Sequence, residues 1–125
     1  MFGRDNVVVR KSYAFAVKIV NLHKELMARM RDYTLARQLL KSGTSIGANV
    51  HEGLYAQSNA DFLNKMSIAL KEASETEYWL NLLHDTDYLT DGEFTPMICE
   101  CKENLRLLTA ITRTTKNKIN EGKTN

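Results

Sequence analysis

Prolines and cysteines are scarce in this chain of 125 residues. Its single proline is Pro96, so most of the sequence is free to form long helices, which an internal proline would break. The two cysteines, Cys99 and Cys101, are two positions apart and would point to nearly opposite sides of a helix. They are poorly placed to pair with each other and too few for a structural zinc site. This usage of cysteine favours a reducing compartment.

Long apolar runs are also lacking. No stretch approaches the roughly 20 apolar residues that a membrane-spanning helix needs. The first residues, MFGRDNVVVRKSYAF, lack the apolar core and small-residue cleavage site of a secretory signal. The composition, 43% hydrophobic and 26% charged, is that of a globular chain and excludes a disordered one. We therefore expect one domain over residues 1–125, in the cytoplasm.

Charge, by contrast, is present in quantity and is unevenly distributed. Residues 1–50 hold nine Lys and Arg against three Asp and Glu, and residues 104–125 hold five against one. Residues 51–103 hold three against eleven, so the middle of the chain is acidic and both ends are basic. This asymmetry fits a nucleic-acid surface, pairing between helices, or head-to-tail assembly of copies.

Apolar residues recur at helical spacing in four stretches. We expect helices at about 12–31, 35–55, 60–85 and 93–118, followed by a frayed tail at 119–125. Short turns between such helices force neighbours to run antiparallel. The pattern predicts an all-α fold, an up-down-up-down four-helix bundle.

The spacing also predicts which residues each helix buries. On the first helix they are Phe15, Ile19, Leu22, Leu26 and Met30. On the second they are Leu35, Leu39, Gly43, Ile46, Val50 and Leu54. On the third they are Phe62, Met66, Ala69, Ala73, Thr76, Leu80 and Leu83. On the fourth they are Phe94, Ile98, Cys101, Leu105, Leu108, Thr112 and Thr115.

Polar residues mark where three of the helices begin. Thr34 is placed to cap the second helix, and Ser58 or Asn59 the third. Thr90, followed three residues later by Glu93, has the spacing of a capping box ahead of the fourth. Because Pro96 prefers the first turn of a helix, Thr95 is the alternative cap.

The stretch KSGTSIGANVHEG, residues 41–53, is rich in glycine and hydroxyl side chains. A phosphate-binding loop would need its lysine after the glycines and a strand before them, and this stretch has neither. Gly43 and Gly47 instead fall four apart within a helical pattern, which places them on one face. Because each glycine costs about 1 kcal/mol of helix propensity, we expect both to serve close packing between helices.

The same stretch resembles a known family. LLKSGTSIGANVHEG, with the later run SIALKEASETEYWL, is similar to the four-helix-bundle family of 23S rRNA intervening-sequence proteins, to which accessory proteins of diversity-generating retroelements are related. The resemblance covers residues 12–118. Its structural motif comprises Ser42, Gly43, Ser45, Ile46, Gly47, Ala48, Asn49 and Glu52.

This resemblance implies a left-handed bundle that assembles into a homopentamer. For the retroelement accessory members it further implies a basic surface that binds RNA or DNA, and a partner that handles nucleic acid, a reverse transcriptase. Members encoded within rRNA intervening sequences have no firmly assigned activity.

Basic residues also gather at one end of the predicted bundle. In an up-down bundle the start of the first helix lies beside the end of the last. The candidate nucleic-acid contacts collected there are Arg10, Lys11, Lys18, Arg113, Lys116 and Lys118. A solvated charged face, or cations answering the dipole at a helix C-terminus, is the alternative.

Catalytic and metal-binding patterns are not found. His23, His51 and His84 are scattered, and His51-Glu52 has no second histidine four residues on. We expect no catalytic residues, no metal ligands and no cofactor. The expected function is a non-enzymatic, homo-oligomeric interaction module that binds nucleic acid or a protein handling it. The alternatives are a purely structural assembly protein and a small-molecule binder that uses the bundle core.

Overall fold

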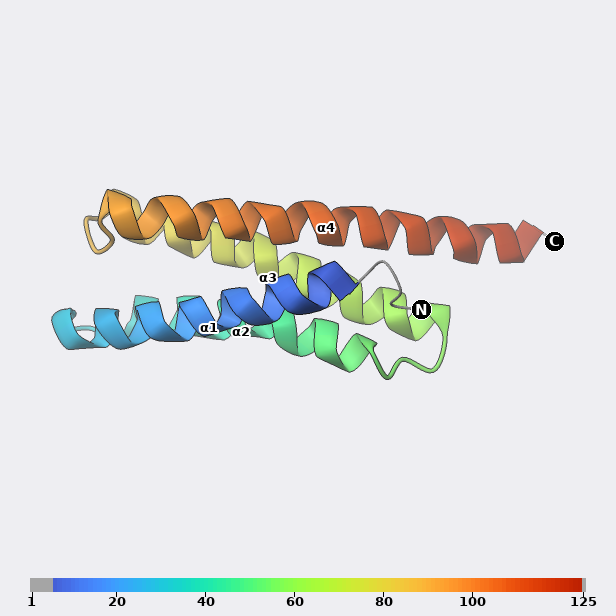
Figure 1. Cartoon of the computed structure of the whole chain (residues 1–125), viewed down its shortest axis with the longest axis horizontal. Coiled ribbons are helices and arrows are strands. Elements are labelled where there is room, and N and C mark those ends of the chain that lie inside the picture. The colour runs from blue at the N-terminus through green and yellow to red at the C-terminus, as the bar shows by residue number, and fades with distance from the viewer. Residues whose placement is uncertain (1–5, 125) are drawn as a thin grey trace.

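The computed structural model describes residues 6–124, and every regular element in that range is a helix. In chain order the helices are α1 (Asn6–Arg29), α2 (Thr34–Gly53), α3 (Asn59–Asp85) and α4 (Asp91–Thr124). They alternate in direction and form a four-helix bundle, which confirms the predicted all-α fold (Figure 1).

The helices pack in the order of the sequence. Contacts join α1 to α2, α2 to α3 and α3 to α4, while the contact that closes the bundle, between α1 and α4, is the smallest. Figure 1 shows α4 running past the turn between α2 and α3. The C-terminal end of α4 is therefore the least covered part of the bundle.

Two helix ends differ from the sequence prediction. α1 begins at Asn6 rather than near residue 12, because Val8 is fully buried in the bundle and packing outweighs the low helix propensity of the Val7–Val9 run. α4 continues to Thr124 rather than ending near residue 118, since no proline interrupts its last turns. Asn125, the end of the predicted frayed tail, lies outside the described residues.

The predicted faces of α1 and α3 are buried in full, and those of α2 and α4 in part. On α2, Leu35 is half-buried and Leu54 lies exposed beyond the helix end. On α4 the buried face is rotated from the predicted one. Met97, Asn104 and Ile111 are buried, and the predicted Phe94, Ile98 and Leu105 are half-buried.

Side chains cap two of the helices as predicted. The Ser58 hydroxyl accepts a hydrogen bond from the Asp61 amide at 3.1 Å. Thr90 and Glu93 form a reciprocal capping box, with the Thr90 amide donating to Glu93 at 3.0 Å and the Glu93 amide donating to the Thr90 hydroxyl at 3.2 Å.

The prediction that Thr34 caps α2 was wrong, because Thr34 lies inside the helix rather than before it. Thr34 is the first residue of the helix, and it donates both its amide and its hydroxyl to the Asp32 carboxylate, at 2.9 and 2.7 Å. The Thr34 amide, followed by its hydroxyl, lowers the pKa of Asp32. The turn is therefore closed by an acidic side chain two residues earlier than the helix start.

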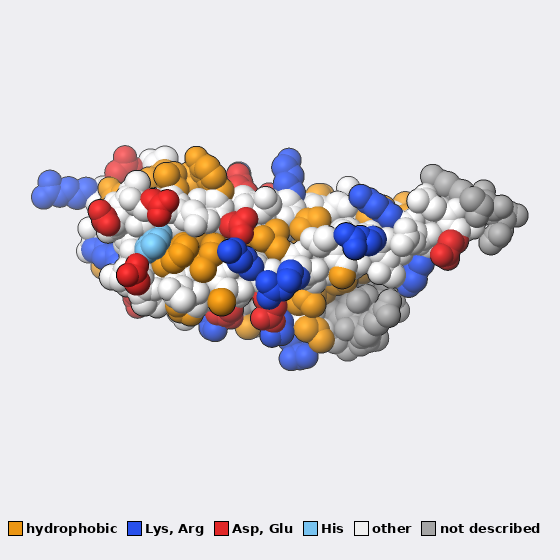
Figure 2. Space-filling view, turned by 90° about the horizontal axis from the view of Figure 1, so that it is seen from above, with side chains coloured by type: hydrophobic (Ala, Val, Ile, Leu, Met, Phe, Trp, Pro, Cys, Tyr) orange, Lys and Arg blue, Asp and Glu red, His pale blue; other side chains and the backbone are white. Residues whose placement is uncertain are grey.

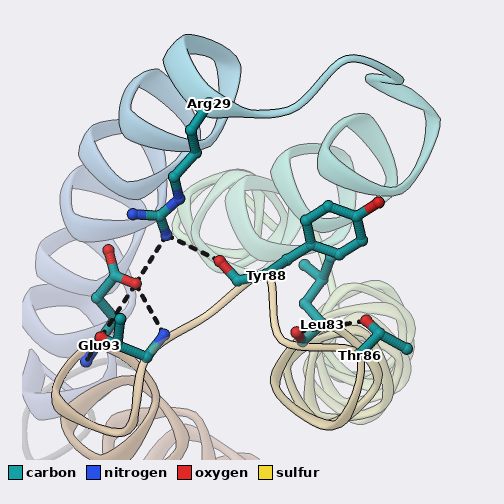
Figure 3. A network of polar contacts seen from close by, with 6 residues as sticks. Arg29, Leu83, Thr86, Tyr88 and Glu93 are labelled. Atoms are coloured by element: carbon teal, nitrogen blue, oxygen red, sulfur yellow. Dashed lines mark hydrogen bonds and ion pairs between the residues drawn. The ribbon is translucent and has the colours of Figure 1, made fainter.

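An ion-pair network ties the end of α1 to the turn before α4 (Figure 3). Arg29 donates to the Tyr88 carbonyl at 2.9 Å and to the Glu93 carboxylate at 2.7 Å. The hydrogen bond from Arg29, followed by that from the Thr90 amide, lowers the pKa of Glu93 to about 2. Glu93 thus caps α4 and holds α1 at the same time.

Glu93→Gln should therefore lower the free energy of unfolding at pH 7 by about 1–2 kcal/mol, a value discounted because Arg29 is exposed. The stabilisation by Glu93 is complete above its ordinary pKa of 4.5 and is lost as the pH falls through about 2. Urea unfolding of both proteins should show the difference at pH 7 and its disappearance near pH 2. Glu103→Gln, which removes a more exposed ion pair, is the control and should cost less; an equal cost at pH 7 would contradict this role of Glu93.

Asp87, two residues after the end of α3, adopts a left-handed conformation, with φ of 68°. The Tyr88 amide donates to the Leu83 carbonyl at 2.9 Å and the Asp87 amide to the His84 carbonyl at 3.1 Å, the two bonds of a Schellman motif. Glycine is the residue best suited to this position.

Asp87→Gly should raise the free energy of unfolding by about 0.5–1 kcal/mol, measured by thermal and urea denaturation. Asp85→Gly, two residues earlier and inside α3, is the matched control and should lower it. Destabilisation by both changes would show that the turn gains nothing from glycine.

Candidate nucleic-acid interface

Two of the six candidate cations are neutralised within the bundle. Lys11 forms an ion pair with Glu103, and Lys18 forms one with Glu100 at 2.7 Å. Both pairs join α1 to α4 across the smallest of the helix contacts. Lys11 and Lys18 therefore face acidic side chains of α4, and little of their charge is left for a ligand.

Arg10 lies beside this seam. It is exposed, and within residues 6–124 no carboxylate lies within ion-pair distance of it. Together with Lys11 it lines a hollow of about 200 Å³ between α1 and α4.

The other three candidates lie on the last turns of α4. Arg113 and Lys116 line an open groove of about 410 Å³, and Lys118 follows two residues later, exposed. The rest of the groove is polar apart from one leucine of α3: Leu70, Thr109, Thr112, Asn117 and Asn120.

The structure brings the six candidates into two groups rather than one. Lys11 meets Glu103, and Arg113 is ten residues further along α4, about 15 Å along the helix axis. The predicted end of the bundle is thus divided between a group on α1, in which two of the three cations are paired, and an exposed group on α4.

Arg106 belongs to the α4 group and was not predicted from the sequence. It is exposed and lies seven residues, about two turns, before Arg113, which places both on one side of the helix. The signal for it was the sequence between Asn104 and Asn120, which contains four cations and no carboxylate. We name Arg106, Arg113, Lys116 and Lys118 the α4 cations.

The α4 cations have no ion-pair partner among the described residues. Figure 2 shows acidic side chains crowding the end where α4 begins and Lys and Arg side chains spread over its later half. Most of the carboxylates of α4 therefore precede the α4 cations along the helix, with Glu121 the exception.

The small-residue motif of α2 is used for packing, as predicted. A Cβ atom added at Gly43 would lie 2.8 Å from the Ile19 side chain of α1, and one added at Gly47 would lie 3.1 Å from the Ser12 backbone oxygen. Ile46, between them, is fully buried, and Ala48 is exposed. The two glycines let α1 approach α2 closely.

The polar residues of the motif bond within the bundle. Ser42 accepts a hydrogen bond from Thr76 of α3 at 3.0 Å. Ser45 and Asn49 donate to carbonyls of the preceding turn, at 2.6 and 2.8 Å, and Glu52 pairs with Lys65 of α3 at 3.4 Å. The motif thus joins α2 to both of its neighbours.

The two thiols and the metal-binding residue types are dispersed over the bundle. Burial, as the main cause, raises the pKa of the Cys101 thiol to about 12, while Cys99 is exposed, and both thiols are free. Among the residues that the structure describes, no three His, Cys, Asp or Glu side chains are grouped to hold a metal ion. None of the described helices is long and apolar enough to cross a membrane.

Comparison with known proteins places the chain in a family. No curated protein matches it. It is similar to a crystal structure of a protein with unknown function from the S23 ribosomal protein family of Bacteroides thetaiotaomicron, with 50% identity and a TM-score of 0.81 over 84% of this chain and 97% of that one. The model of the 23S rRNA-intervening sequence proteins matches residues 4–110. The chain belongs to the family of 23S rRNA-intervening sequence proteins.

Proposed function

We propose that this protein is a non-enzymatic, homo-oligomeric module that binds RNA through the α4 cations. One observation carries the proposal: α4 exposes four cations, with Lys118 on the side of the helix opposite Lys116, and no carboxylate of the described residues lies within ion-pair distance of them. Phosphate groups along a strand that passes around α4 are the ligand that such a group of charges recognises, whatever the base sequence. The names of the family and of the similar structure, which refer to rRNA and to a ribosomal protein family, agree with RNA as the ligand.

Binding of this kind works by release of counterions from the strand. If the α4 cations each contact one phosphate of a single strand, the logarithm of the affinity should fall with the logarithm of the salt concentration with a slope of about −3. Raising the salt from 50 to 200 mM would then weaken binding about 50-fold.

Fluorescence anisotropy of a labelled single-stranded RNA of about 20 nucleotides, titrated at both salt concentrations, tests the proposal. A DNA strand of the same sequence reports whether the 2′-hydroxyl contributes. Absence of binding to either strand at 50 mM salt would rule out the proposed function.

The homo-oligomer is supported by an exposed apolar stripe on α1. Tyr13, Val17 and Val20 are 71%, 44% and 36% exposed and follow one another at spacings of four and three, the spacing of a helix–helix seam. The stripe lies in the basic part of the sequence, whereas the outer side of α3 exposes Tyr78 beside the acidic residues Glu75 and Glu77. We propose that α1 of one copy packs on α3 of the next, a head-to-tail contact that closes into a ring, a pentamer by family resemblance.

Light scattering tests this assembly. A ring would give a mass several times 14.3 kDa at micromolar concentration, and Val17→Glu would reduce it. The matched control is Gln38→Glu, which adds the same charge at an exposed position of α2, outside the proposed contact. A wild-type mass of 14.3 kDa would refute assembly.

A further inference from the structure

The hollow between α1 and α4 has features that neither the bundle core nor the α4 cations explain. Its volume is about 200 Å³, and it lies on the seam that the Lys11 and Lys18 ion pairs cross. The residues that line it are Arg10, Lys11, Ala14, Glu100, Glu103 and Asn104.

Asn104, which lines the hollow, carries an unused hydrogen-bond acceptor that the rim side chains cover. The residue is 1% exposed, and its Nδ2 donates to the Glu100 carbonyl at 3.0 Å. Its Oδ1 is buried and has no hydrogen-bond partner among the described residues. A buried amide oxygen without a donor opposes folding, so a polar side chain at this position is not explained by packing.

The rim of the hollow supplies one free charge. Glu103 and Glu100 are paired with Lys11 and Lys18, while Arg10 has no ion pair in the part of the chain that the structure describes. A complementary ligand therefore carries two groups. One is an N–H donor that can reach the Asn104 oxygen, and the other is an anionic group that can contact the Arg10 guanidinium. Because the rim side chains are long and their ion pairs exposed, moving them aside to admit a ligand costs little.

We propose that this hollow binds one nucleotide whose base carries an amino group. The amino group of adenine, cytosine or guanine donates to Asn104 Oδ1, and the phosphate contacts Arg10. Inorganic phosphate alone meets only half of the site. The hollow is distinct from the α4 cations, so it binds a free nucleotide whether or not those cations bind RNA; when both act, it holds one base of a bound strand.

Titration of the ¹⁵N-labelled protein with AMP, followed by NMR, tests the proposal. The expected result is a saturable shift of the Asn104 side-chain amide signals. Two control ligands are used. Purine riboside 5′-monophosphate lacks only the amino group of AMP, and ribose 5-phosphate lacks the whole base. Both should bind at least about 10-fold more weakly than AMP, since the buried acceptor then stays unpaired.

Variants separate the site from the fold and from the proposed function. Asn104→Leu removes the acceptor at similar volume, so it should keep or raise the melting temperature and lose at least about 10-fold in AMP affinity. Arg10→Gln should weaken AMP binding, and Arg113→Gln with Lys116→Gln should leave it unchanged.

Equal binding of AMP and purine riboside monophosphate would overturn the inference. The absence of any chemical-shift change on addition of AMP would also overturn it, because the hollow would then bind no nucleotide. Either result could accompany normal RNA binding through the α4 cations, and loss of RNA binding could accompany normal AMP binding, so the two proposals fail separately.

Discussion

Arg113→Gln combined with Lys116→Gln should weaken RNA binding about 30-fold at about 100 mM salt, because each of the two side chains supplies about 1 kcal/mol of binding free energy through its phosphate. The two side chains make up half of the α4 cations. Both residues are exposed and line a polar groove, so the fold should keep its thermal stability. Anisotropy titrations of labelled RNA measure the change.

The matched control is Lys11→Gln combined with Lys18→Gln. It lowers the net charge by the same two units, so a dependence on overall charge alone would make the two double variants equal. The ion pairs with Glu103 and Glu100 instead predict that the α1 variant loses less than about 3-fold, because its cations are already neutralised. Equal losses would contradict the assignment of binding to α4.

Gly43→Val should lower the free energy of unfolding by about 3 kcal/mol, the cost of overpacking a core site. An added Cβ would already lie 2.8–2.9 Å from three atoms of Ile19, a fully buried side chain that cannot turn away. The gain in helix propensity on replacing glycine, less than about 1 kcal/mol, is too small to offset this. Urea denaturation followed by circular dichroism gives the value.

Gly53 provides the control within the same helix. An alanine there would crowd only the terminal methyl of Met66, a flexible side chain that can move. Gly53→Ala should therefore change stability by less than about 0.5 kcal/mol, whereas Gly43→Ala should destabilise by about 1 kcal/mol. If neither alanine variant changed the free energy of unfolding, the close approach of α1 would not require glycine at position 43.

The sequence alone predicted the structure where helical periodicity and capping residues determine it. The seven predicted core positions of α3 follow its period and are all buried, and Ser58 caps it as its hydroxyl suggests. Tertiary packing decided the rest. Val8 extends α1 through burial, and Asn104 occupies a buried position of α4, where hydropathy had selected the neighbouring Leu105.

The candidate interface was predicted only in part, for a similar reason. The basic character of the last turns of α4 follows from the sequence alone. The pairing of Lys11 and Lys18 does not follow from the sequence, because it depends on the register between α1 and α4. Lys18 and Glu100, for example, are 82 positions apart in the chain. Which cations stay free is therefore a property of the packed bundle.

The salt dependence of RNA affinity tests most directly the claim that free cations on α4 bind phosphate. For the wild-type protein the logarithm of affinity against the logarithm of salt concentration should have a slope of about −3. For Arg113→Gln with Lys116→Gln the slope should fall to about −1.4, and for Lys11→Gln with Lys18→Gln it should stay near about −3. A wild-type slope near zero, or the same slope in both double variants, would contradict the claim.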